Sequence, residues 1–363
     1  MRVLYDYAAF VMQSCGGVSR VLYDLFRHVS ERPDTDCKLF AGFHRNQYLC
    51  DAPASVKQHI VGWHLPEEIV KQRIFMPINR YLFRCYARRF QPDICHHTYL
   101  QTPRVPVGCK EVVSIQDMIH ERFPAMFSPS DPQRAWKKNA VNRADGVICP
   151  SATTRSDLER FIDLQGKPVE VIHYGNSMQG VLPASIDFPY PYLLYVGSRG
   201  VQYKNFELVL QALTRCKDQT DMHLACFGGN EFSIAELRLI EDRGLTGRVH
   251  RFGGSDAQLA AFYTGARALI YPSLYEGFGL PPIEAMGFGC PVLSSSAPPM
   301  PEIIGGAAWY FDPTSVEAAA AQLVRLHDEA ERASLIYEGR IRAAEFSWTQ
   351  TADVTVAFYR SLG

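Results

Sequence analysis

Residues 273–291 read SLYEGFGLPPIEAMGFGCP, and this stretch decides the fold of the second half of the chain. A short apolar run, Ala268–Tyr271, precedes it and predicts a buried strand. A turn with two glycines follows at 276–279, and a helix is expected at Pro281-Pro282, because proline fits the first turn of a helix. Strand, glycine turn and helix in this order are typical of a parallel sheet covered by helices.

The same stretch carries residues suited to binding a ligand with phosphate and hydroxyl groups. Glycines let a ligand approach the backbone closely, and the start of a helix offers free N–H groups and a positive dipole end to a phosphate. Glu276 and Glu284 bracket that point. Carboxylates beside an anion would be repelled by it, so they are better suited to accepting hydrogen bonds from sugar hydroxyls. The alternative is a surface glutamate and a helix-dipole partner, but the glycines on both sides of Phe278 favour a ligand site.

Strand and helix patterns alternate along nearly the whole chain. This alternation predicts an α/β protein with two Rossmann-like, doubly wound domains that face each other across a cleft. The other expected strands are Arg2–Tyr5, Lys38–Gly42, Val112–Ile115, Gly146–Cys149, Val169–Ile172, Tyr192–Val196, His223–Phe227, Val249–Phe252 and Pro291–Ser294, and the expected helices include Val18–Val29, Pro132–Ala144, one after Ser151, Phe206–Ala212 and one from Val316 onward.

A break in this alternation marks the domain boundary. The stretch Gly175–Pro191 holds two glycines and three prolines without apolar periodicity, as linkers do. We therefore expect a first domain over residues 1–175, a linker over 176–191 and a second domain over 192–348. A last helix, at about 349–363, is expected to return to the first domain.

Composition excludes several classes of protein. The 363 residues are 47% hydrophobic and 21% charged with a net charge of -1, which is typical of a globular protein and gives no sign of a nucleic-acid partner. The sequence contains no apolar run of 18 residues, so no membrane-spanning helix is expected. The ten cysteines form no C-x-x-C pair, so we expect free, mostly buried thiols and a cytoplasmic location.

Five segments together resemble the family 4 retaining glycosyltransferases of the GT-B fold, and most closely the bacterial mannosyltransferase-like group that builds O-antigen and capsule. Glu276 and Glu284 match the E-x7-E signature of that family. The other segments are MRVLYDYAAFVMQSCGGVSRV at the start, VSIQDMIHERFP at 113–124, YVGSRGVQYKNFELVLQA at 195–212, and PEIIGGAAWYFDP with FSWTQTADVTVAFY near the end.

The resemblance implies a hexosyltransferase that keeps the anomeric configuration and needs neither metal nor cofactor. The donor is a nucleotide sugar, with GDP-mannose as the first candidate, and the acceptor is a growing glycan or a lipid-linked sugar. Glu284 would bind the ribose and Glu276 the hexose. The remaining donor-binding residues implied are Gly16, Gly17, Arg199, Lys204, Gly254, Ser255, Gly277, Phe278, Gly279 and Leu280.

The chain departs from the family pattern at two places. Ser198 stands where many relatives have an arginine, which here comes one residue later as Arg199. Gln116 stands where many have a histidine that contacts the donor sugar, so the resemblance leaves that role to Asp117 or His120.

Other functions remain open at this point. A nucleotide-sugar epimerase or phosphorylase of the same fold, a glycosidase that uses the two glutamates as acid and base, and an inactive nucleotide-sugar-binding subunit are the alternatives. The D-x-D spacing of Asp34-Thr35-Asp36 follows a proline, and we interpret it as an exposed turn and not as a metal site.

The segment Lys71–Phe90 is basic, has no acidic residue and carries an apolar side. A helix of this kind can lie on an anionic membrane, here the inner face of the cytoplasmic membrane, or it can pack on the sheet with its charges in water. Both interpretations stay open, and Pro77 argues against one continuous helix.

Overall fold

A computed structural model describes residues 1–66, 68–69, 71–101 and 103–363. The chain forms two compact units. Unit 1 comprises Met1–Ser177 together with Ser347–Gly363, and unit 2 comprises Met178–Phe346. The first change of unit lies within the stretch 175–191 in which we expected the linker, and the last helix belongs to unit 1.

Unit 1 is built on a parallel sheet with the strand order β3-β2-β1-β4-β5-β6-β7. Its strands are β1 Arg2–Tyr5, β2 Asp36–His44, β3 Ile60–His64, β4 Ile94–His97, β5 Lys110–Ser114, β6 Gly146–Cys149 and β7 Val169–Val171. The central strands are buried on both faces, because side chains alternate along a strand and helices cover both sides. Leu4 thus faces the cluster that includes Phe83 of a helix on one side, while Tyr5 meets Phe26 on the other.

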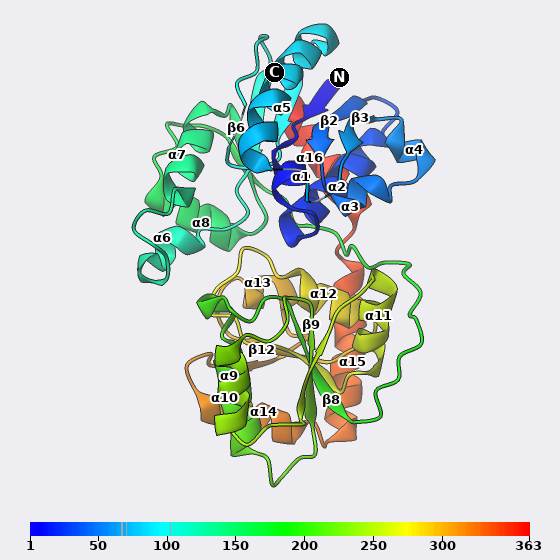
Figure 1. Cartoon of the computed structure of the whole chain (residues 1–363), viewed down its shortest axis with the longest axis vertical. Helices are drawn as coiled ribbons and strands as arrows, with labels where there is room; N and C mark the ends of the chain where they lie inside the picture. The colour runs from blue at the N-terminus through cyan, green and yellow to red at the C-terminus, as the bar shows by residue number, and fades with distance from the viewer. Residues whose placement is uncertain (67, 70, 102) are drawn as a thin grey trace. The chain divides into compact units, whose positions relative to one another are not determined.

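The longer helices of unit 1 pack on this sheet and on each other. They are α2 Gly17–Ser30, α5 Gln72–Phe90, α7 Gln133–Arg143, α8 Ala152–Phe161 and the C-terminal α16 Trp348–Ser361, and the short ones are α1 Ala8–Met12, α3 Gln47–Cys50, α4 Ala54–Lys57 and α6 Ile119–Arg122. Helix α16 packs on α2 (Figure 1). Its Tyr359 is fully buried and reaches His96 and Tyr5, so residues from both ends of the chain complete the core of unit 1.

Helix α5 corrects one expectation from the sequence. Pro77 lies inside a single continuous helix of 19 residues. The backbone bond that proline cannot make is outweighed by packing of the opposite face, where Asn79, Phe83 and Ala87 are buried. The Asn79 side chain donates to the Phe43 carbonyl at 3.0 Å and accepts from its N–H at 2.9 Å, which fixes α5 on β2.

Unit 2 repeats the architecture with the strand order β10-β9-β8-β11-β12-β13, again parallel. The strands are β8 Tyr192–Val196, β9 His223–Phe227, β10 Val249–Phe252, β11 Ala268–Tyr271, β12 Val292–Ser295 and β13 Trp309–Phe311. The helices are α9 Phe206–Arg215, α10 Ile234–Asp242, α11 Asp256–Gly265, α12 Leu280–Gly287, α13 Met300–Ile304, α14 Val316–Arg325 and α15 Glu329–Ala344. Helices α9 and α14 cover one face of the sheet and α11, α12 and α15 the other (Figure 1). The expected class, two Rossmann-like units with parallel sheets, is therefore confirmed.

Candidate functional site

The sequence-predicted residues of unit 2 gather on the loops that follow neighbouring strands β8 and β11. Lys204 ends a short 3-10 turn, Gln202–Lys204, after β8, and Glu276 lies in the loop after β11. The two side chains meet, with Lys204 Nζ donating to Glu276 Oε1 at 2.6 Å. Because the strands are adjacent and parallel, their carboxyl ends share one edge of the sheet, where ligands of such folds bind.

Asn205 fixes the loop that carries Lys204. Its backbone is left-handed, with φ of +54°, and its side-chain amide donates to the carbonyls of Pro272 at 3.1 Å and Pro313 at 2.8 Å. The Leu274 N–H also bonds the Tyr203 carbonyl at 2.8 Å. The two loops are thus held together by their backbones, so the Lys204–Glu276 pair is not a chance encounter of mobile side chains.

The surroundings of the Lys204–Glu276 pair partly shield it from water. The side chains are 20% and 11% exposed. The ammonium lies 5.7 Å from the centre of the Tyr271 ring. The pKa of Tyr271 is raised well above its usual value, first by burial and then by the Glu276 carboxylate, so this tyrosine stays a neutral hydroxyl. The site therefore offers one cation and one carboxylate side by side, which suits a ligand with both phosphates and hydroxyls.

Gly279 shapes the turn that leads into α12. Its φ is +104°, a conformation that other residues rarely adopt, and a Cβ there would lie 2.7 Å from the Met300 side chain. Gly279 is the N-cap of α12 and no side chain caps that end. Leu280 opens the helix, and Phe278 is buried against Phe346. Pro281 and Pro282 have no N–H, so the start of α12 presents the N–H groups of Gly279 and Leu280, without a side-chain cap.

Glu284 lies on α12 and is 4% exposed. Its Oε2 accepts a hydrogen bond of 2.9 Å from the hydroxyl of Tyr263, a fully buried residue on α11. A buried carboxylate needs such donors, because burial without them costs several kcal/mol. The alternative of a solvent-exposed helix-dipole partner is therefore wrong for Glu284.

Arg199 and Lys204 follow the same strand, β8, but their side chains have different partners. Its side chain is 2% exposed and bonds Glu236 at 3.0 Å, the Gly228 carbonyl at 3.0 Å and the Asn230 carbonyl. In this arrangement the guanidinium fixes the loop after β9, since all of these partners are contacts within unit 2. A phosphate role for Arg199 stays a prediction.

Gly254 and Ser255 form the start of α11. Ser255 is the N-cap in a capping box with Gln258, in which each side chain bonds the backbone of the other. The hydroxyl of Ser255 therefore has a structural partner already. Donor binding by Gly254 and Ser255 stays a prediction.

The predicted residues of unit 1 gather around a cavity of about 90 Å³. It is lined by Val18, Thr98, Tyr99, Leu100, Ser114, Gln116, Asp117, His120, Gln133 and Lys137. Asp117 and His120, the two candidates for contact with the donor sugar, thus both line this cavity, and the start of α2 adjoins it through Val18. Gly16 serves a local purpose here: a Cβ would lie 2.6 Å from the Gln13 side chain, which caps α2 by accepting from Ser19 N–H. The space beside Gly17 is open.

Three groups in the wall of this cavity are held in fixed orientations. The Tyr174 hydroxyl donates to Gln116 Oε1, which leaves the amide N–H groups of Gln116 as its donors. Asp117 Oδ1 accepts from the Ile119 N–H at 3.0 Å and lies 3.8 Å from the ammonium of Lys137. His120 stacks on Phe127 with ring centroids 4.0 Å apart. The wall thus combines amide, carboxylate and imidazole groups, as sugar hydroxyls require.

Sequence reasoning missed Lys137, Tyr174 and Tyr263. Lys137 is 3% exposed and its ammonium bonds Glu121 at 2.7 Å. A lysine in a helical pattern is usually a solvated surface charge, and a tyrosine near a strand is usually part of the core. Neither residue type therefore indicates a ligand site in the sequence. Only the folded contacts identify them.

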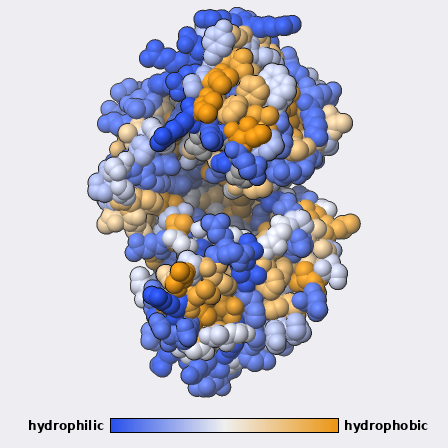
Figure 2. Space-filling model, in the orientation of Figure 1, coloured by the Kyte–Doolittle hydropathy of each residue, from blue (hydrophilic) through white to orange (hydrophobic). Residues whose placement is uncertain are grey.

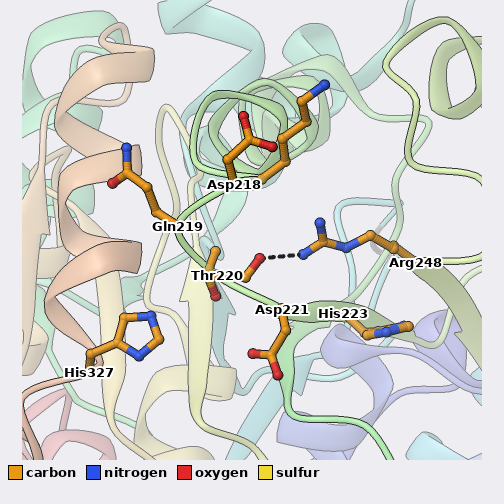
Figure 3. Close-up of a pocket in the computed structure, with 8 residues that line it drawn as sticks. Asp218, Gln219, Thr220, Asp221, His223, Arg248 and His327 are labelled. Atoms are coloured by element: carbon orange, nitrogen blue, oxygen red, sulfur yellow. Dashed lines mark hydrogen bonds between the residues drawn. The ribbon is translucent and has the colours of Figure 1, made fainter.

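A larger, open depression of about 620 Å³ lies elsewhere on unit 2. It surrounds the residues just before β9, including Thr220 and Asp221, with His223, Arg248 and His327 at its rim (Figure 3). Arg248 donates to the Thr220 carbonyl at 3.0 Å. Thr220 and Asp221 precede β9 and Arg248 precedes β10, so the depression lies at the amino-terminal edge of the sheet, opposite to the loops that carry Lys204 and Glu276. We therefore do not assign the donor to this depression.

Within the described ranges, no group of three or more metal-ligand side chains comes together. No described helix combines the length and apolarity needed to cross a membrane. Cys149, Cys226 and Cys290 are buried free thiols, as expected.

Comparisons with known proteins place these features in a class. A model described as Glycosyltransferase Family 4 matches residues 15–176, and one described as Glycosyl transferases group 1 matches residues 185–342. The whole structure is similar to sucrose-phosphate synthase from Thermosynechococcus elongatus, with a TM-score of 0.78, 20% identity and coverage of 99% and 98% of the two chains. It is also similar to Anabaena Alr3699/HepE in complex with UDP-glucose, with a TM-score of 0.73, 17% identity and coverage of 99% and 100%. These similarities identify the fold as GT-B.

A curated relative agrees with this class. O-antigen chain mannosyltransferase B of Escherichia coli is 34% identical over 177 residues, which are 47% of this chain and 46% of the relative. The match thus spans about half the length of that relative. Taken with the two family models, it shows that the chain belongs to the family 4 glycosyltransferases of the GT-B fold.

Proposed function

We propose that the protein is a retaining glycosyltransferase that moves a hexose from a nucleoside diphosphate sugar to a hydroxyl of a growing glycan or lipid-linked acceptor. The observation that carries this proposal is the Lys204–Glu276 pair together with the Gly279 and Leu280 N–H groups at the start of α12. A cation and helix N–H groups suit the diphosphate, while a carboxylate suits the hexose hydroxyls. GDP-mannose is the first donor to test, because the E. coli relative is named a mannosyltransferase.

The chemistry follows from these positions. Departure of the nucleoside diphosphate builds negative charge on the leaving phosphate, and Lys204 with the N–H groups at the start of α12 stabilises that charge. Glu276 holds the hexose through its hydroxyls, and Glu284 holds the ribose. The leaving phosphate takes the proton of the acceptor hydroxyl on the same face of the sugar, so no protein nucleophile, metal or cofactor is needed.

We further propose that the cavity of unit 1 binds sugar hydroxyls. Gln116 offers amide donors and Asp117 a carboxylate acceptor in its wall, and His120 a ring nitrogen. Because Gln116 replaces the histidine of the family pattern, we assign it to the same task as Asp117. A variant with Gln116 changed to Glu should bind free nucleoside diphosphate normally but lose turnover.

Helix α5 is the proposed contact with an anionic membrane, at the inner face of the cytoplasmic membrane. Ile74, Ile78 and Tyr81 are 52%, 40% and 69% exposed at a helical spacing that places them on one face. Exposed arginines, including Arg84 and Arg88, adjoin that face. Figure 2 shows hydrophobic and strongly hydrophilic side chains side by side on unit 1. Apolar insertion with a basic rim is the pattern of interfacial helices.

A thermal-shift screen tests the central proposal. The chain is measured with ADP, CDP, GDP and UDP and with their common hexose derivatives, since a ligand that binds the folded state raises the melting temperature by mass action. We expect one base to stabilise clearly and its sugar form to support transfer of the hexose. Stabilisation without transfer to any acceptor would instead favour a nucleotide-sugar-binding subunit, and cleavage of a finished glycan without nucleotide would favour a glycosidase.

A further inference from the structure

Two residues on neighbouring helices of unit 2 fix the orientation of Glu284. Tyr263 lies near the end of α11, and its hydroxyl donates to Glu284 Oε2 at 2.9 Å. The Tyr263 ring stacks on Phe288, with centroids 6.0 Å apart and an interplanar angle of 10°. Phe288 is the C-cap residue directly after α12, four residues beyond Glu284, and Tyr263 contacts both.

This arrangement leaves Tyr263 little freedom. The residue is fully buried, which fixes its ring between the two helices, and the ring in turn fixes where its hydroxyl lies. A glutamate side chain has three rotatable bonds and loses much rotamer entropy when a ligand orders it. A hydroxyl that already orients the glutamate in the folded protein means that this entropy is lost during folding and not during binding.

We infer that Tyr263 is a positioning residue for nucleotide recognition: its hydroxyl sets the carboxylate of Glu284 in the orientation that accepts the ribose hydroxyls. This inference rests on the ribose role proposed for Glu284. It adds a residue that does not touch the ligand and acts through another side chain. It also explains why a tyrosine hydroxyl is kept in an otherwise apolar contact between α11 and α12.

The chain offers a matched control for the test. Tyr192 is also buried, and its hydroxyl donates to the Phe262 carbonyl of the same helix α11 at 2.9 Å. Tyr192→Phe therefore removes a buried hydroxyl and a hydrogen bond of equal length next to the same helix, without touching Glu284. Circular dichroism and melting temperature report whether either variant disturbs the fold.

The readout is discrimination between a nucleoside diphosphate and its 2′,3′-dideoxy form, measured by calorimetry with the base that the screen selects. The unchanged chain should prefer the ribose form by roughly 10- to 100-fold, as expected for hydrogen bonds to a carboxylate. Tyr263→Phe should reduce this preference to a few-fold while leaving affinity for the dideoxy form nearly unchanged. Tyr192→Phe should keep the full preference.

Each other outcome is decisive. If Tyr263→Phe keeps the preference of the unchanged chain, or if both variants lose it equally, Tyr263 has only a structural role and the inference fails while the proposed function stands. If Tyr263→Phe does not fold, Phe288→Leu removes the ring stacked on Tyr263 and must lower the same preference. If the unchanged chain binds none of the four nucleoside diphosphates, both the proposed function and the inference are overturned.

Discussion

Replacing Lys204 with Met is the most informative single change, because it keeps the length of the side chain and removes only the charge. The ammonium lies 2.6 Å from Glu276 Oε1 in a pair that is 20% and 11% exposed. A charge-assisted hydrogen bond to a diphosphate contributes about 1.5–3 kcal/mol. Loosening the existing pair with Glu276 offsets up to about 1 kcal/mol of this, since the pair is partly solvated. The net loss in Lys204→Met is therefore about 0.5–3 kcal/mol, which corresponds to a rise of about 2- to 160-fold in Kd.

Calorimetry with the selected nucleoside diphosphate measures this loss, and Lys217→Met is the control. Lys217 lines the depression at the opposite edge of the same sheet, so its loss changes the net charge equally but not the proposed site. We expect Lys217→Met to bind like the unchanged chain. Equal Kd values for both variants would show that Lys204 is only the ionic partner of Glu276, and the assignment of the diphosphate to this loop would be wrong.

Three further predictions test other parts of the molecule. Glu284→Gln should weaken binding of free nucleoside diphosphate, whereas Glu276→Gln should lower kcat and leave that binding nearly intact; the reverse pattern in calorimetry and initial rates would exchange their roles. Burial lowers the pKa of His96 to about 3, below the value of about 6.5 expected in the unfolded chain, so stability should fall as pH drops below 6.5. Chemical denaturation should show that the loss of stability between pH 7 and pH 5 is about 2 kcal/mol smaller in His96→Gln than in the unchanged chain, and an equal slope in both proteins would contradict this. Replacing both Arg84 and Arg88 with Gln should reduce sedimentation of the protein with anionic vesicles at low salt. The same change of Arg134 and Lys138 on α7 should not reduce it. Binding to neutral vesicles as strong as binding to anionic vesicles would refute the membrane contact.

Much of the fold was predictable because its strands are short apolar runs bounded by polar turns. The strands Arg2–Tyr5, Gly146–Cys149 and Val249–Phe252 have the predicted limits in the structure. Strand β4, which has the sequence ICHH, was missed because two of its four residues are polar histidines, although the strand is fully buried. Their burial depends on partners distant in sequence, including Tyr359 for His96 and Asp6 for His97, and no local pattern shows such partners.

The candidate site divides in the same way. Glu276, Gly279 and Glu284 follow from one continuous motif, since a strand, a turn and a helix fix their spacing locally. The contact of Lys204 with Glu276 joins residues 72 positions apart and becomes visible only when β8 and β11 lie side by side. Arg199 was expected to bind the donor. The ion pair that it forms with Glu236 depends on how the segment after β9 folds, and the sequence alone does not show this.

The return of α16 to unit 1 sets an order for biosynthesis. Unit 2 is one unbroken segment, Met178–Phe346, so it can fold as soon as that segment has left the ribosome. Unit 1 is completed only when α16 has emerged as well, because its buried partners Tyr359 and Thr351 belong to that helix. The half of the protein that is made first is therefore finished last. Until then its sheet keeps an uncovered apolar face, which is where chaperones and proteases would act on the nascent chain.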